Sequence, residues 1–216
     1  FVSSHMNRFE TRLDDEFKRI VIPNGIESLS LNVERKDPSG VGMMGITPQS
    51  KGFHRALAML DMLCKLSPSA TLKIKGKLPR EYPWMKRRID ENNWYESLMT
   101  SYPELFENNR IIHEGFTTDV SHFVATSKSV LSFSDHESFH IAPLEGAVGR
   151  TLVHMLPWEG AREIHRANWI FNSAQEVAND IMMIESTGNA YELGCENRQF
   201  VMNNYDHRFI SMHLYL

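Results

Sequence analysis

The sequence predicts one α/β domain, a three-layer sandwich in which helices cover both faces of a mostly parallel sheet. Short apolar runs bounded by turn residues alternate with amphipathic stretches, which is the pattern of parallel strands joined by crossover helices. No internal repeat or low-complexity tract interrupts this alternation. The 216 residues are enough to bury the core of one such Rossmann-like domain with closing helices at the C-terminus.

The order of the predicted elements indicates where a ligand binds. Strands are expected at 19–22, 41–45, 71–75, 110–113, 130–133, 151–155 and 169–171. Helices are expected at 6–17, 51–66, 119–127, 143–149, 174–185 and 196–213. In parallel sheets of this kind the ligand lies beyond the carboxyl ends of the strands, where loops lead into helix N-termini. We therefore expect the site in the loops after 41–45 and 130–133.

The composition is typical of a globular protein from a reducing compartment. The net charge of −4 argues against a nucleic-acid binder. No apolar run reaches the roughly 18 residues of a membrane span, and Cys64 and Cys195 are in no metal or redox spacing. We therefore expect a cytoplasmic protein.

One segment is strongly basic. Residues 73–88 include seven basic side chains and one acid, Glu81, with Tyr82 and Trp84 between them. A solvated face explains this pattern, but such a segment also attracts an anionic membrane surface or an acidic acceptor. Peripheral contact with the inner face of a membrane is therefore one of the expected interactions.

Gly40, Gly42 and Gly45 form the G-x-G-x-x-G pattern of dinucleotide-binding proteins, but their context differs. The preceding residues, K-D-P-S, are typical of a turn, and no acid ends a second strand about 20 residues later. A strand at 41–44 and a loop at 45–50 fit better, with Lys51 opening a helix. A lysine beside the free N–H groups of a helix N-terminus is typical of a phosphate or diphosphate site.

Residues 135–145, D-H-E-S-F-H-I-A-P-L-E, fit two different chemistries. His136, Glu137 and His140 form H-E-x-x-H, the zinc-protease pattern, in which one helix carries both histidines and the glutamate acts as the base. Alternatively, Glu137 and Glu145 are two carboxylates on a strand-to-helix turn, able to accept hydrogen bonds from sugar and ribose hydroxyls.

Pro143 favours the second geometry. The run 130–133 predicts a buried strand, so only two residues separate it from His136. A helix begun at His136 would have Pro143 in its second turn, where proline costs about 3 kcal/mol. Proline is favoured instead in the first turn of a new helix. We therefore predict a loop at 136–141 and a helix at 143–149, with loop N–H groups directed at a diphosphate.

Seven short motifs follow one another along nearly the whole chain. They are F-V-S at 1–3, V-I-P-N-G-I at 21–26, Gly45 with S-K-G-F at 50–53, L-K-I-K-G at 72–76, S-F-S-D-H-E-S-F-H-I-A-P-L-E-G at 132–146, W-E-G-A-R-E-I at 158–164 and N-R-Q-F-V at 197–201. In this order they resemble the C-terminal, nucleotide-sugar-binding domain of GT-B retaining glycosyltransferases, family 4 or group 1. The E-x7-E element, with Pro-Asn-Gly and Lys-Gly in register, is the most specific part.

The resemblance implies a hexosyltransferase that moves a sugar from a nucleoside diphosphate sugar to a saccharide or lipid-linked acceptor, with retention of configuration, in polysaccharide biosynthesis. Glu137 would be the catalytic residue beside the transferred sugar, and Lys51 would hold the donor diphosphate. The other donor-binding positions would be Gly45, Ser138, Phe139, His140 and Ile141 at the diphosphate, Glu145 at the ribose and Phe116 at the base. No metal or other cofactor is expected, because Lys51 and helix N–H groups would neutralise the diphosphate.

The same resemblance implies a domain organisation. Residues 1–18 would be a tail from an N-terminal Rossmann domain, 19–187 the donor-binding domain and 188–216 a C-terminal helical segment. The chain would then be the C-terminal half of a GT-B fold. The acceptor would bind through the missing N-terminal domain, and we expect the chain alone to be inactive.

The chain departs from the family pattern at one position. Family members carry an arginine beside the first glycine of the Gly45 region, where this chain reads G-M-M-G-I at 42–46. The leaving diphosphate would lose a bidentate partner. Two alternatives stay open: a zinc-dependent hydrolase that uses His136, Glu137 and His140, and a non-catalytic glycosyltransferase-like interaction domain.

Overall fold

The computed structural model describes residues 3–4, 21–27 and 40–212, and in this part of the chain five strands form one sheet. The strands are β1 Val41–Met44, β2 Leu72–Lys75, β3 Ile111–His113, β4 Ser129–Ser132 and β5 Leu152–Met155. Their order across the sheet is β3-β2-β1-β4-β5, and all four pairings are parallel. The predicted α/β fold with a parallel sheet is confirmed.

Helices connect the strands and close the domain. The α-helices of the described residues are α2 Phe53–Leu66, α3 Ile89–Ser101, α4 Pro103–Glu107, α5 Ser121–Thr126, α6 Ile141–Val148, α7 Ala161–Ile164, α8 Ala174–Thr187, α9 Ala190–Tyr205 and α10 His207–Met212. Shorter 3-10 helices are η1 Gln49–Lys51, η2 Pro79–Glu81, η3 Pro83–Arg87 and η4 Ala167–Trp169. None of these helices has both the length and the apolar character needed to cross a bilayer.

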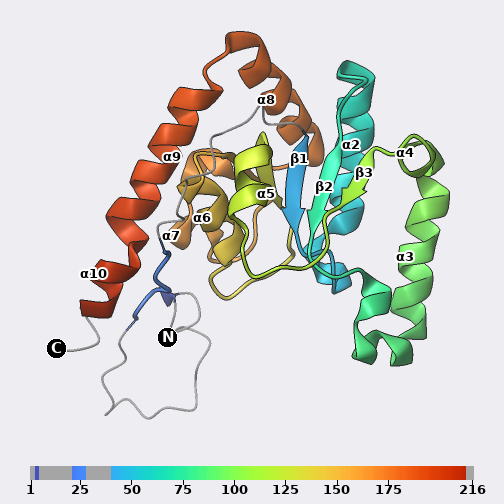
Figure 1. The fold of residues 1–216 in the computed structure, drawn as a ribbon, viewed down its shortest axis with the longest axis horizontal. Coiled ribbons are helices and arrows are strands. Elements are labelled where there is room, and N and C mark those ends of the chain that lie inside the picture. Colours follow the sequence, from blue (N-terminus) through green and yellow to red (C-terminus); the bar gives the residue numbers. More distant parts are fainter. Residues whose placement is uncertain (1–2, 5–20, 28–39, 213–216) are drawn as a thin grey trace.

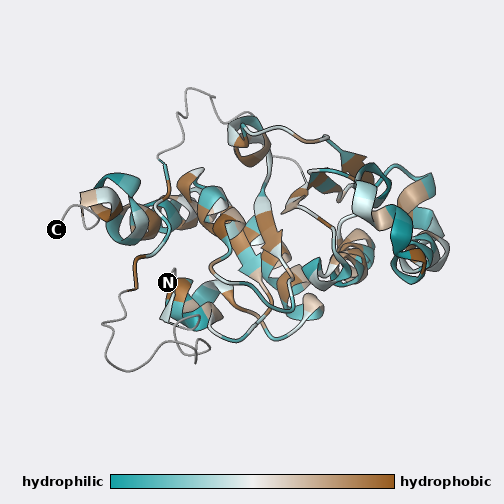
Figure 2. Cartoon of the chain, turned by 90° about the horizontal axis from the view of Figure 1, so that it is seen from below, coloured by the Kyte–Doolittle hydropathy of each residue, from teal (hydrophilic) through white to brown (hydrophobic). Residues whose placement is uncertain are grey.

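Two helical layers cover the sheet on opposite faces (Figure 1). α2 and α8 pack against each other on one face, whereas α6 packs on β4 and β5 on the other face and α9 packs on α6. Val41, Met43 and Ile74 are buried with the apolar side chains of α2. Hydropathy colouring shows brown strands at the centre and teal along the outer sides of the helices (Figure 2). Burial of apolar surface between these layers stabilises the fold.

The strand order forms a crevice above the carboxyl ends of β1 and β4. The chain moves outward from β1 to β3 and then returns through α5 to β4, on the other side of β1. In open parallel sheets ligands bind at such a reversal of direction. The loops after β1 and β4, where the sequence predicts a site, both lie at this end of the sheet.

The predicted strands agree with the structure for the five that form the sheet, within one or two residues at each end. The strand predicted at 169–171 is wrong, because η4 ends at Trp169 and Ile170 makes only an isolated bridge to Met155. The strand predicted at 19–22 lies half outside the described residues, and its described half is not a strand. The helix predicted at 6–17 lies outside the described residues.

The helix predictions need three corrections. α3, α4 and α7 were not predicted; α3 buries only Tyr95 and Leu98, so its apolar pattern is weak. α2 begins at Phe53 rather than at residue 51, because Gly52 has a left-handed backbone. The helix predicted at 196–213 begins earlier, at Ala190, and is two helices, since Asp206 leaves helical geometry and pairs with the segment at 21–27.

Candidate functional site

The loop after β4 leads through His140 into α6. His140 is the N-cap residue, with φ 60° in the left-handed region, and Pro143 lies in the first turn of the helix. The H-E-x-x-H motif therefore lies in a loop, as the position of Pro143 predicts. His136 is exposed, whereas His140 is turned inward, with its Nδ1 2.8 Å from Ser132 Oγ.

Gly52 lets the loop between β1 and α2 approach the loop after β4. Its φ is 77°, and a Cβ at this position would lie 2.0 Å from the carbonyl oxygen of Phe133. Asp135 donates its N–H to the carbonyl oxygen of Ser50 over 2.8 Å. Arg55 adds an ion pair to Asp135 over 2.6 Å and a hydrogen bond to the Phe133 carbonyl oxygen. The two loops are therefore held together by the protein itself.

Lys51 and Glu137, one from each loop, form an ion pair at the crevice. Lys51 Nζ lies 2.5 Å from Glu137 Oε1, which also accepts a hydrogen bond from Ser134 Oγ over 2.8 Å. Burial favours a raised pKa for Glu137, but the charges of His140 and Lys51 and the hydrogen bonds from Lys51 and Ser134 outweigh it, so the pKa is lowered. Burial lowers the pKa of His140 to about 4, so at pH 7 this histidine is neutral and Lys51 keeps Glu137 ionised.

His140 and His165 are both buried and neutral beside Glu137. His140 Nε2 lies 3.7 Å from Glu137 Oε1. His165, just after α7, is 3% exposed, and its ring lies 6.1 Å from that of Trp158 and 6.2 Å from that of Trp169. Burial and then the charge of His140 lower the pKa of His165 to about 3. The two histidines therefore add no charge beside the Lys51–Glu137 pair at neutral pH.

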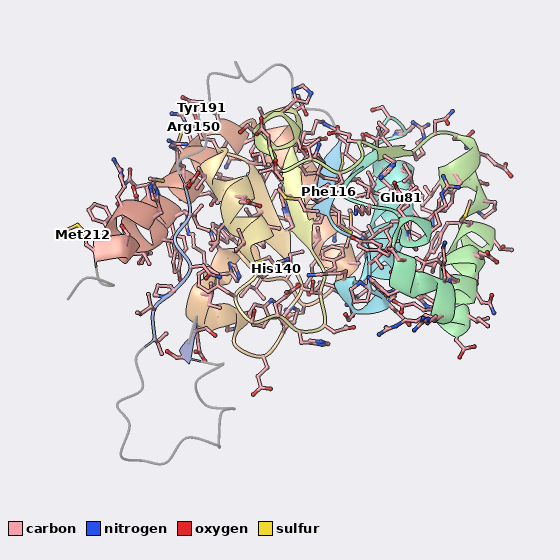
Figure 3. The ribbon with its side chains drawn as sticks, turned by 60° about the horizontal axis from the view of Figure 1, so that its bottom comes forward. Glu81, Phe116, His140, Arg150, Tyr191 and Met212 are labelled. Atoms are coloured by element: carbon pink, nitrogen blue, oxygen red, sulfur yellow. The ribbon has the colours of Figure 1, made fainter. Side chains whose placement is uncertain are left out.

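The predicted ribose and base positions lie on other elements than the Lys51–Glu137 pair. Glu145 lies in the second turn of α6, where burial raises the pKa of its carboxyl group. Phe116 lies in the loop after β3, is 63% exposed and has Lys77 Nζ 5.6 Å from its ring centre. Figure 3 shows Phe116 and His140 on separate parts of the domain.

The remaining predicted residues differ in what they offer to a ligand. The backbone of residues 138–141 enters α6 beside Glu137. Phe139 offers only its backbone, because its side chain is 2% exposed and packs against the ring of Tyr205. Ser138 and Ile141 are exposed, and the Ser138 carbonyl oxygen accepts a hydrogen bond from Ser3. Gly45, with φ 76° at the end of β1, has open space where a side chain would point.

Two residues near the site, Ser134 and Lys73, were not among the predicted site residues. Ser134 orients Glu137 through a single hydroxyl. Lys73 in β2 is 7% exposed, and its Nζ lies 3.0 Å from Glu114 Oε1 and 2.6 Å from Thr126 Oγ1. A basic residue inside a predicted strand could have indicated that Lys73 is buried and paired. It was instead grouped with the basic residues of 73–88, most of which are exposed.

The H-E-x-x-H residues do not have the geometry of a zinc protease. That chemistry needs both histidines on successive turns of one helix, so that they face one ion. Here the motif precedes α6, and of its two histidines only His140 is turned inward. Within residues 3–4, 21–27 and 40–212, no three His, Cys, Asp or Glu side chains are grouped as metal ligands would be.

Comparison with known proteins identifies solved structures of the same fold. No family model matches the sequence, and no curated protein matches it significantly. A mutant of S. aureus TarM, solved with UDP among its ligands, is 14% identical, with a TM-score of 0.75 over 96% of this chain and 40% of TarM. Anabaena HepE in complex with UDP is 20% identical, with a TM-score of 0.72 over 91% of this chain and 56% of HepE.

A third structure is itself a single domain. It is the C-terminal domain of LpcC, a group 1 glycosyl transferase from Francisella tularensis, which is 19% identical. The TM-score is 0.66 over 84% of this chain and 99% of that domain. The chain thus spans 40% of TarM and 56% of HepE but corresponds to the LpcC domain alone. It therefore has the fold of the C-terminal domain of GT-B, group 1 glycosyltransferases.

Proposed function

We propose that the chain is the donor-binding domain of a retaining glycosyltransferase that uses a nucleoside diphosphate sugar. The observation that carries this proposal is the Lys51–Glu137 pair, a cation and an ionised carboxylate beside the N-terminus of α6 at the β1–β4 crevice. The fold supports it, since TarM and HepE were solved with UDP and share this domain.

Each group at the crevice has a role that suits its chemistry. Lys51 binds the donor diphosphate as a point charge, and the N–H groups of residues 138–141 add hydrogen-bond donors at the N-terminus of α6. Once Lys51 turns to the phosphate, the Glu137 carboxylate accepts hydrogen bonds from the hydroxyls of the sugar. Glu145 accepts hydrogen bonds from the ribose hydroxyls, and Phe116 contacts the base.

In the proposed reaction the bond between the anomeric carbon and the diphosphate breaks, and a bond from that carbon to an acceptor oxygen forms. Negative charge develops on the leaving diphosphate, where Lys51 and the N–H groups at α6 stabilise it without a metal or cofactor. The acceptor is a saccharide or a lipid-linked sugar that binds mainly to a part of the enzyme outside this chain. The chain alone therefore binds the donor but does not transfer sugar.

Calorimetric titration with UDP, GDP and ADP tests the donor site. At least one of them should bind, and Lys51→Ala should weaken that binding about 10-fold or more, as expected for loss of a charge-assisted hydrogen bond. Lys65→Ala is the matched control, because Lys65 is exposed on α2 and pairs with Asp61. Glu145→Gln should weaken the binding of a nucleoside diphosphate and of the matching nucleoside (uridine, guanosine or adenosine) to the same extent, since its proposed contact is the ribose.

Two outcomes would contradict the donor-site proposal. If no nucleoside diphosphate binds, or if binding is the same in wild type and Lys51→Ala, a non-catalytic interaction domain explains the fold better. Binding should also persist in EDTA, because Lys51 and backbone N–H groups are the proposed partners of the diphosphate. A requirement for added divalent cation would show that the metal-free part of the proposal is wrong.

The same function includes contact with an anionic membrane that presents a lipid-linked acceptor. η2 and η3 expose Trp84, at 41%, beside exposed cations, and Ile89 just after them is 68% exposed. The cations are Lys77, Arg80, Lys86, Arg87 and Arg88. Cations around exposed apolar side chains suit an anionic bilayer surface, with about 1 kcal/mol for each cation.

Co-sedimentation with vesicles tests this contact. Phosphatidylglycerol vesicles should retain the protein, phosphatidylcholine vesicles should not, and Lys86→Glu with Arg87→Glu should abolish retention. Exchange of the exposed Lys128, which pairs with Glu185, for Glu should have little effect. Equal sedimentation with both lipids, or retention of the double variant, would contradict the proposed membrane contact. The donor-site proposal would not be affected.

A further inference from the structure

Lys75 lies at the carboxyl end of β2, beside the donor crevice. It pairs in register with Met44 of β1, and its carbonyl oxygen accepts a hydrogen bond from the N–H of Gly45 over 2.8 Å. β1 is the central strand, and β4 is its other neighbour. Lys75 is therefore one strand away from the point where the β1 and β4 loops bring Lys51 and Glu137 together.

The direction of the Lys75 side chain follows from the strand. Residues i and i+2 of a strand point to the same face, so Lys75 shares the face of Lys73. Lys73 Nζ contacts Thr126 of α5, which lies over the sheet on the side opposite α2. Ile74 points to the other face and is buried in the core with α2. Lys75 therefore faces the layer of α5 and α6 at the open end of the sheet.

Within the described residues, no carboxylate forms an ion pair with Lys75. Lys51, Arg55 and Lys73 each form an ion pair with a carboxylate. Lys75 is half-buried, yet its ammonium group has no hydrogen bond or ion pair to any residue in the described ranges. Asp119, in the loop after β3, is near enough that hydrogen bonds from Ser121 and, more weakly, the charge of Lys75 lower its pKa.

A diphosphate at this crevice needs more positive charge than Lys51 alone supplies. Its phosphates carry at least two negative charges, and the position beside Gly45 is occupied by the apolar Ile46, which is 2% exposed. Neighbouring strands lie about 4.8 Å apart, so Lys75 is about 10 Å from β4, and its flexible four-carbon stem spans much of that distance.

We propose that Lys75 is the second cation of the donor diphosphate site, opposite Lys51 across the end of β1. This inference rests on the proposed donor-binding function and assigns one further residue to it. A lysine binds phosphate as a point charge and not through a fixed fork, so Lys75 can serve a diphosphate from a neighbouring strand. The two lysines then lie on either side of the diphosphate, with the α6 N–H groups at its end.

The test compares UDP, UMP and uridine by calorimetry in wild type, Lys75→Met, Lys75→Arg and Lys65→Met. Lys75→Met should weaken the binding of UDP about 10-fold and that of UMP less. The binding of uridine should not change. Lys75→Arg should recover most of the loss, and Lys65→Met should match wild type. The dependence of UDP affinity on salt concentration should also become shallower in Lys75→Met, because fewer ionic contacts remain.

The outcomes separate this inference from the donor-site proposal. If Lys51→Ala weakens UDP but Lys75→Met does not, the inference fails and the donor site stands. If Lys75→Met weakens the binding of uridine as much as that of UDP, Lys75 acts through Asp119 on the loop after β3, where the base is proposed to bind. That result also overturns the inference. If neither lysine affects UDP, the donor-site proposal itself fails. A melting temperature equal to that of wild type shows that Lys75→Met is folded.

Discussion

Two lysine–glutamate pairs at the same end of the sheet differ in what surrounds them. Lys73 and Glu114 lie 3.0 Å apart, with side chains 8% and 19% exposed, and Thr126 accepts a second hydrogen bond from the lysine. Lys51 and Glu137 lie 2.5 Å apart, with side chains 29% and 15% exposed, so the two pairs differ in the exposure of the lysine and not of the carboxylate. The first pair connects β2 to the residue that follows β3, whereas the second connects two loops at the crevice.

The difference shows which pair can exchange partners. A buried lysine cannot leave its carboxylate without leaving that charge unpaired in a poorly solvated place, which is costly. The more exposed Lys51 can turn to water or to a ligand, and Glu137 then still accepts the hydrogen bond from Ser134. We therefore assign Lys73–Glu114 to the architecture of the loop after β3, and Lys51–Glu137 to ligand binding.

The largest expected effect on stability comes from a substitution that breaks the buried Lys73–Glu114 pair. Lys73→Met should lower the free energy of unfolding by about 3 kcal/mol, because Glu114 keeps its position without a counter-charge. Lys51→Met should lower it by less, because Lys51 is more exposed than Lys73 and Ser134 still donates a hydrogen bond to Glu137. Urea unfolding followed by circular dichroism measures both.

A double variant serves as the control for the buried pair. Lys73→Met with Glu114→Gln should regain part of the loss, since no buried charge is then left unpaired. Equal costs for Lys73→Met and Lys51→Met would show that the two pairs do not differ in the way their burial indicates.

The next effect is a dependence of stability on pH at the crevice. The folded-state pKa values of His140, about 4, and His165, about 3, both lie below the usual 6.5. Below pH 6.5 the unfolded chain binds protons at these sites that the folded chain does not, so stability falls as the pH falls toward 4. Each histidine contributes up to about 1.4 kcal/mol per pH unit. The raised pKa of Glu145 opposes this trend, whereas the lowered pKa values of His54 and Glu137 add to it.

Urea midpoints at pH 7.5, 6 and 5 measure this dependence. The decline should be steeper in wild type than in His165→Gln, because the variant has lost one of these depressed pKa values. His122→Gln, at an exposed position on α5, should decline like wild type. Parallel profiles in all three proteins would contradict the assignment of His165 as a buried neutral histidine.

Local sequence signals explain which parts of the fold were predictable. Because proline geometry is a local property, Pro143 placed the start of α6 to within two residues, and the helix begins at Ile141 rather than at the predicted 143. The parallel sheet followed from the alternation of apolar runs, and the loops after β1 and β4 followed from the rule for parallel sheets. The proximity of Lys51 and Glu137, 86 residues apart, was expected only through that topology and the resemblance.

Contacts between distant segments explain most of what sequence could not show. The break between α9 and α10 depends on Ile26, whose N–H donates to the Tyr205 carbonyl oxygen and whose carbonyl oxygen accepts from His207. The inward turn of His140 depends on Ser132 and on a left-handed backbone that no pattern announces. α3 was missed for a local reason, its weak apolar periodicity.

The bridge between Ile26 and Asp206 also has a mechanical consequence. The segment 21–27 lies where α9 ends and α10 begins, so an early part of the chain and a late one are tied at a single place. α9 packs along α6, whose first residues border Glu137. A pull on the segment 21–27 would therefore reach the crevice through α9 and α6.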